Sequence, residues 1–84
     1  LRRTWDEVRQ VMAPGALDPL VKEMVYVAVS ATNGCEYCTH SHTAAARAKG
    51  MSEAMLMELM AVTALANATN RLANGLRIPV DERF

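Results

Sequence analysis

The sequence predicts an all-α fold, and three observations support this fold class. No segment alternates polar residues with β-branched ones, so no strand is indicated. Apolar residues recur at helical spacing, and Pro, Gly and Asn residues separate these segments as they do at helix ends. Because the 84 residues contain no repeat, low-complexity stretch or linker, we expect a single domain over residues 1–84.

A short amphipathic helix is predicted at the start of the chain. Thr4 can cap its N-terminus, and Pro14-Gly15 ends it. Its apolar side consists of Trp5, Val8, Val11 and Met12. Asp18-Pro19 then combines an N-cap residue with a proline at the first helical position, which predicts the start of a second helix. Asn33-Gly34 ends this second helix.

Two further helices follow. The third starts at Cys35 or Glu36 and runs to Lys49, because Gly50 stops it. Ser52 can cap the fourth, which is predicted to continue to about Leu72, before Asn74-Gly75. The tail over residues 76–80 is predicted to be extended.

The fourth predicted helix is apolar on nearly all sides. Between Ala54 and Ala66, only Glu58 and Thr63 interrupt the apolar residues. Such a helix is buried on more than one side, which a small single bundle does not provide. Hydrophobic residues make up 51% of the chain, more than so small a core needs. We therefore expect a homo-oligomer, with an adaptable ligand surface around Met51, Met55, Met57 and Met60 as the less favoured alternative.

Charge and hydropathy exclude several classes of function. The formal net charge is zero and the only basic cluster is Arg2-Arg3, so no nucleic-acid partner is expected. No apolar segment has the length of a membrane span and no signal-peptide pattern is present, so we expect no membrane association and a cytoplasmic protein. The chain begins at Leu1 rather than methionine, which is consistent with a part of a longer chain.

The two cysteines of the chain lie in a CxxC motif that a histidine follows. At about 100° per residue, Cys38 lies roughly 60° from Cys35 around a helix, and His42 roughly 40° from Cys38. The three side chains therefore share one stripe of the third helix. Unpaired N–H groups and the helix dipole favour a thiolate at a helix N-terminus, and His42 can accept a proton from Cys38 or pair with its thiolate.

A histidine in this role needs a carboxylate to orient it, and Glu23 is the candidate. If the second and third helices form a hairpin around Asn33-Gly34, Glu23 falls near the level of His42 to Ala45. The residues themselves also allow an inert cysteine pair or a zinc site. Zinc ligands would be Cys35, Cys38, His42 and either His40 or Glu23.

A known family shares this arrangement. Glu23, eleven further residues and then Cys35-x-x-Cys38-x-x-x-His42 resemble the signature of AhpD-like alkylhydroperoxidases, which belong to the carboxymuconolactone decarboxylase superfamily. The Ala-Lys-Gly-Met-Ser stretch that follows supports the match, which covers roughly residues 17–72. The resemblance implies an all-helical bundle with the CxxC at a helix N-terminus, assembled as a homo-trimer or hexamer.

The resemblance also implies catalytic roles and partners. Cys38 would be the peroxidatic cysteine and Cys35 the proton donor and resolving thiol, while His42 would activate Cys38 with Glu23 behind it. The activity would be a thiol peroxidase or disulfide reductase in antioxidant defence, with a hydroperoxide as substrate. A lipoyl or thioredoxin-like dithiol would be the reductant, and a peroxiredoxin is a further possible partner. No cofactor is expected beyond a redox-active Cys35–Cys38 disulfide.

One position departs from the family pattern. Members with established peroxidase activity tend to carry histidine where this chain has Tyr37, and a tyrosine is a poor base near neutral pH. Weak turnover or a different substrate is therefore an open alternative. So is a redox-sensing or helical assembly module without efficient turnover.

Overall fold

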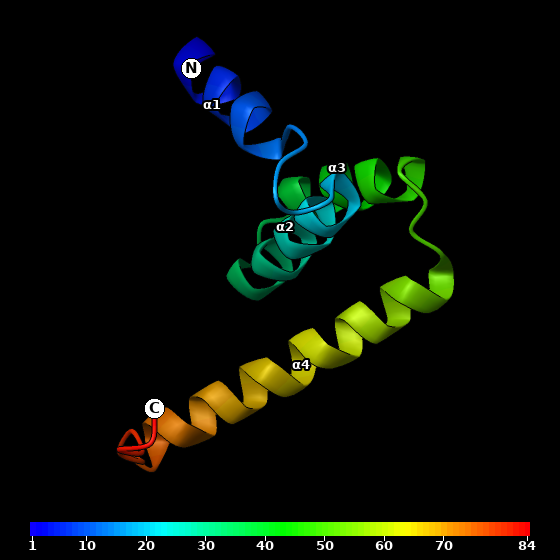
Figure 1. Ribbon diagram of the computed structural model, residues 1–84. Coiled ribbons are helices and arrows are strands. Elements are labelled where there is room, and N and C mark those ends of the chain that lie inside the picture. Colours follow the sequence, from blue (N-terminus) through cyan, green and yellow to red (C-terminus); the bar gives the residue numbers. More distant parts are fainter.

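The computed structural model describes residues 1–84 and contains four α-helices and no strand, which confirms the predicted fold class. The helices are α1 (Arg2–Met12), α2 (Pro19–Asn33), α3 (Glu36–Ala48) and α4 (Glu53–Gly75). Helices α2 and α3 form a hairpin in the middle of the molecule. The short α1 projects from one side of this hairpin, and the long α4 runs along the other (Figure 1).

The α2–α3 hairpin forms where the sequence predicts it. The Asp18 carboxylate accepts the Leu20 N–H at 2.8 Å and so caps α2, whose first residue is a proline. At the other end Gly34 adopts the left-handed conformation with φ 72°, which a side chain would disfavour. The Cys35 N–H then bonds back to the Ser30 carbonyl at 2.9 Å. This closing hydrogen bond turns the chain directly from α2 into α3.

A second glycine turn separates α3 from α4, again as predicted. Gly50 has φ 108°, and the Met51 N–H bonds back to the Ala46 carbonyl at 3.0 Å. This hydrogen bond brings the buried Met51 side chain against the end of α3. Ser52 then caps α4 by accepting the Met55 N–H at 3.1 Å.

Three details of the prediction are wrong. Thr4 is not an N-cap, because α1 already begins at Arg2; the two arginines are good helix formers and extend it. Helix α4 continues through Gly75, because the left-handed position that ends it is taken by Arg77, with φ 51°. The Arg77 and Ile78 N–H groups bond to the Asn74 and Ala73 carbonyls. Leu76 and Arg77 therefore form a turn, and the tail is not extended from its first residue.

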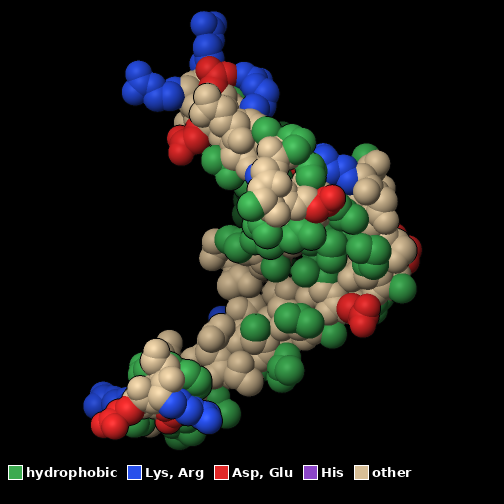
Figure 2. Space-filling model, viewed as in Figure 1, with side chains coloured by type: hydrophobic (Ala, Val, Ile, Leu, Met, Phe, Trp, Pro, Cys, Tyr) green, Lys and Arg blue, Asp and Glu red, His purple; other side chains and the backbone are tan.

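The single chain buries very little. Only five of its 84 residues are buried, namely Glu23, Val27, Ser30, Ala46 and Met51. Its accessible surface is 6762 Å², whereas a compact folded monomer of 9.2 kDa exposes about 4,900 Å². Figure 2 shows hydrophobic side chains over the middle of the molecule and further ones along α4. The predicted bundle is thus incomplete within one chain.

None of the four helices combines the length and the apolar character needed to cross a lipid bilayer.

Lys22 anchors α1 to the hairpin. Its ammonium group donates to the Val11 carbonyl at 2.8 Å and to the Ala13 carbonyl at 2.6 Å, at the C-terminal end of α1. A cation is favourable at this end of a helix dipole. We expect Lys22→Met to lower the free energy of unfolding by roughly 1 kcal/mol and to speed amide exchange in α1.

Hydrogen exchange and the fluorescence of Trp5, the single tryptophan of the chain, measure this loosening. Lys22→Arg keeps a cation that can reach the same carbonyls and serves as the control. Unchanged exchange in α1 of Lys22→Met would show that the apolar contacts alone hold this helix.

Candidate redox-active site

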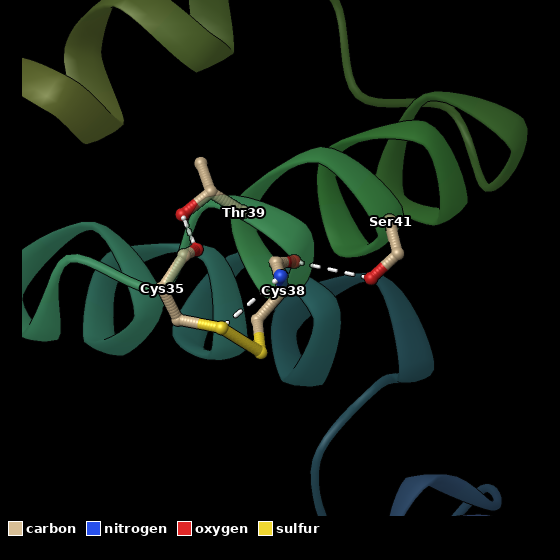
Figure 3. The surroundings of a disulfide bond; sticks show 4 residues. All are labelled: Cys35, Cys38, Thr39 and Ser41. Atoms are coloured by element: carbon tan, nitrogen blue, oxygen red, sulfur yellow. Dashed lines mark hydrogen bonds between the residues drawn. A yellow bond between two sulfur atoms is a disulfide. The ribbon is translucent and has the colours of Figure 1, made fainter.

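Cys35 and Cys38 form a disulfide at the N-terminus of α3, with their Cα atoms 5.3 Å apart (Figure 3). Cys35 is the N-cap residue of α3, so the predicted position of the CxxC at a helix N-terminus is confirmed. The Thr39 hydroxyl donates to the Cys35 carbonyl at 2.8 Å, and the Ser41 hydroxyl donates to the Cys38 carbonyl at 3.2 Å. These hydrogen bonds fix the first turn of α3 around the two sulfur atoms.

The helix N-terminus acts on the sulfur of Cys35. Cys35 Sγ accepts the backbone N–H of Cys38 at 3.3 Å, as a serine or aspartate oxygen does in an N-cap. The same N–H and the helix dipole stabilise negative charge on this sulfur after the disulfide opens. Both cysteines are partly exposed, so an external thiol can reach the pair.

Glu23 and His42 meet across the hairpin, as the sequence predicts. Glu23 Oε2 lies 2.7 Å from His42 Nδ1, and their side chains are only 6% and 17% exposed. A carboxylate at Nδ1 accepts the proton of that nitrogen and leaves the Nε2 lone pair free. The arrangement therefore orients an imidazole that can take up a proton at Nε2.

His42 lies one helical turn after Cys38 on the same stripe of α3. In the disulfide form, neither sulfur is hydrogen-bonded to the imidazole. The structure thus brings Glu23 and His42 into direct contact on the hairpin that carries the Cys35–Cys38 disulfide, with His42 one helical turn after Cys38. Their catalytic roles remain predictions.

Two neighbours of this group were not predicted as site residues. Tyr26 stacks on the His42 ring with centroids 3.6 Å apart and planes at 18°. It lies three residues after Glu23, so both residues point to the same side of α2. Lys49 Nζ lies 3.5 Å from Glu23 Oε1. Helical spacing in α2 could have indicated Tyr26, but no local pattern links Lys49 to Glu23.

The zinc alternative would need both cysteines as free thiolates, and here they are joined in a disulfide. No group of three or more His, Cys, Asp or Glu side chains is arranged to hold a metal ion. His40 is exposed and lines an open hollow with Glu36, Tyr37 and Ser41. Tyr37 itself is 73% exposed, so its side chain borders the disulfide region without being buried in it.

An apolar groove of about 470 Å³ lies between α1 and α2 and reaches the imidazole through Tyr26. Lys22 is its only polar lining residue, and the others are Val8, Val11, Met12, Leu17, Val25, Tyr26 and Val29. Tyr26 lines this groove and stacks on the His42 ring, so one face of the imidazole is covered by an apolar ring.

Comparison with known proteins agrees with this geometry. The model of the carboxymuconolactone decarboxylase family matches residues 1–81. An alkyl hydroperoxide reductase AhpD from Solibacter usitatus is 38% identical over 72 residues, which are 86% of this chain and 39% of that protein. An uncharacterized protein of the cox locus of Paracoccus denitrificans is 37% identical over 54 residues, covering 64% of this chain and 49% of that protein.

A solved structure matches almost the whole chain. The crystal structure of the alkylhydroperoxidase AhpD core from Rhodospirillum rubrum superimposes with a TM-score of 0.94 at 57% identity. It covers 99% of this chain, which spans 62% of the solved one. The chain is thus shorter than each of these relatives. Family match, sequence identity and structure together show that it is an AhpD-like member of the carboxymuconolactone decarboxylase family.

Proposed function

We propose that the protein is a thiol-dependent peroxidase and disulfide reductase of the AhpD type, acting in antioxidant defence. The observation that carries this proposal is the partly buried hydrogen bond between Glu23 and His42, one helical turn from a cysteine of the Cys35–Cys38 disulfide. A dithiol alone would serve many functions. A dithiol beside an oriented imidazole has the base that a thiol peroxidase requires.

The first chemical step takes place at Cys38. His42 Nε2 takes the Cys38 proton, and the thiolate attacks one oxygen of the hydroperoxide. The O–O bond breaks, Cys38 becomes a sulfenic acid, and the departing alkoxide takes up a proton to leave as an alcohol. Glu23 stabilises the imidazolium that exists during this transfer.

Cys35 then completes the cycle. Its sulfur attacks the Cys38 sulfenic acid, the disulfide forms and water leaves. Its place at the helix N-terminus makes Cys35 a stabilised leaving thiolate when an external dithiol attacks Cys38. Two exchanges return both thiols and oxidise the reductant, for which a lipoyl or thioredoxin-like protein is suited. The cycle needs no bound cofactor, and its demand for reduced thiols places it in the cytoplasm.

A homo-oligomer, a trimer or hexamer, is part of the proposal. The single chain exposes more surface than a compact monomer of the same mass. The difference is close to the area that two protein–protein interfaces of standard size bury on one partner, about 800 Å² each. Contacts with further copies of the chain would complete the bundle.

A redox sensor without efficient turnover is the second candidate. The exposed Tyr37 favours it, since this position offers no second base near neutral pH.

Peroxide consumption separates the two candidates. We expect the reduced protein to consume an alkyl hydroperoxide in many turnovers when dihydrolipoamide or dithiothreitol is supplied. Without a reductant it should consume one equivalent for each Cys35–Cys38 pair. Rapid disulfide formation in the first round without further cycling would favour the sensor. Absence of disulfide formation with peroxide would contradict both.

A further inference from the structure

Glu23 has two partners, and His42 is only one of them. Its carboxylate is buried, and each oxygen meets a different group: Oε2 the imidazole at 2.7 Å and Oε1 the Lys49 ammonium at 3.5 Å. A neutral imidazole donates a hydrogen bond but brings no positive charge. Lys49 is the only Lys or Arg within ion-pair distance of this carboxylate. The buried negative charge is thus compensated from a segment outside α2.

The geometry points to Lys49 as a positioning residue of the proposed peroxidase, acting on His42 through Glu23. With the ammonium at Oε1, the carboxylate is held at both of its oxygens, and Oε2 stays directed at His42 Nδ1. Without Lys49, the buried carboxylate would lose its only cationic partner and would be free to turn away from the imidazole. Lys49 therefore keeps Oε2 in place as the acceptor of the Nδ1 proton, which fixes the orientation of the His42 ring.

The fold places Lys49 for this task. It follows α3 directly, where its N–H bonds to the Ala45 and Ala46 carbonyls at 3.1 Å each. The left-handed Gly50 then turns the chain so that Met51 packs into the core. The stem of Lys49 is therefore held at a fixed point about two helical turns beyond His42, while its side chain stays 41% exposed.

Arg47 supplies a matched control on the same helix end. It also stands in the last turn of α3 and also forms an ion pair, with Nε 2.9 Å from Glu53 Oε1. Both side chains carry a positive charge near the C-terminal end of α3, so both interact favourably with the helix dipole. They differ in their partner, because Glu53 is exposed, whereas Glu23 is buried and contacts His42.

We test the inference with Lys49→Met, Lys49→Arg and Arg47→Met. Lys49→Met should lower kcat about tenfold at an unchanged KM for the hydroperoxide, as loss of a partner behind a catalytic histidine does. Lys49→Arg should restore most of kcat, and Arg47→Met should leave it unchanged. Wild-type kcat in Lys49→Met, an equal loss in Arg47→Met, or no rescue by arginine would each overturn the inference.

A second readout is independent of the proposed function on which the inference rests. In the oxidised protein, the Nδ1 proton shared by His42 and Glu23 should give a downfield NMR signal, assigned by its loss in His42→Gln. We expect Lys49→Met to shift or abolish this signal, and Lys49→Arg and Arg47→Met to keep it. If the wild-type protein has no peroxidase turnover, the proposed function fails while the signal still decides the role of Lys49. A signal that is the same in Lys49→Met and the wild type would overturn that role.

Discussion

Replacing Cys38 by serine should abolish hydroperoxide consumption, by about a thousandfold or more, as loss of a catalytic nucleophile does. Replacing Cys35 by serine should instead leave a single round of oxidation. The difference follows from position, since only Cys38 lies one turn before His42 on the stripe. A serine hydroxyl at position 38 has neither the acidity nor the reactivity with peroxide of a thiol.

The two variants are best compared in a single turnover. In Cys35→Ser, the Cys38 sulfenic acid has no partner thiol, so it should accumulate and be trapped by a dimedone-type probe detected by mass spectrometry. In Cys38→Ser, no probe adduct should form. The reverse outcome would make Cys35 the peroxidatic residue, which is the sulfur that the helix N-terminus stabilises directly. The experiment therefore decides which group determines the peroxidatic cysteine. One is the Cys38 N–H, which bonds to the Cys35 sulfur, and the other is the His42 imidazole, which lies one turn after Cys38.

Much of the fold follows from local signals in the sequence. The turn at Gly34 was predictable because a left-handed residue is required there and Asn-Gly is the usual signal for it. The same holds for Gly50 and for the capping residues Asp18 and Ser52. The end of α4 was not predictable, because a left-handed arginine occupies the position that usually takes glycine.

The site residues also fall into those that sequence spacing predicts and those that it does not. Cys35, Cys38 and His42 lie on one helix, so their spacing alone predicts a shared stripe. Glu23 lies on another helix, and its contact with His42 could be expected only from the hairpin and the family signature. Lys49 meets Glu23 through a side chain that extends past the glycine turn, and Tyr26 meets His42 ring to ring. Such contacts depend on the packing of the two helices, which sequence spacing does not determine.

The distribution of apolar residues around α4 links the fold of one chain to its assembly with further copies. One side of α4 faces α2, where the Asn67 amide donates to the Thr32 hydroxyl at 3.1 Å. The other side carries a row of exposed apolar residues at helical spacing, which we call the outer stripe: Met57, Ala61, Leu65, Ala68 and Leu72. A helix with two apolar sides and only one partner is complete only in an assembly. The same copies that bury the outer stripe would also stabilise the hairpin that holds Glu23 against His42.

Leu65→Glu should therefore dissociate the oligomer and lower its thermal stability. Leu65 is 66% exposed in the single chain, and burying it in an interface contributes about 1.5–3 kcal/mol, or about 10–150-fold in the association constant. A glutamate there adds the cost of a buried, unpaired charge. Light scattering at micromolar concentration measures the assembly, and Asn74→Glu, which adds the same charge to α4 outside the outer stripe, is the control.

We expect assembled wild type and Asn74→Glu, and monomeric Leu65→Glu with a lower melting temperature. Peroxidase turnover should fall together with assembly in Leu65→Glu, because five buried residues are too few to hold the hairpin firmly in one chain. A monomeric wild type would contradict the proposed homo-oligomer. An assembled Leu65→Glu would mean that the copies meet through another surface, for which the apolar groove between α1 and α2 is a candidate.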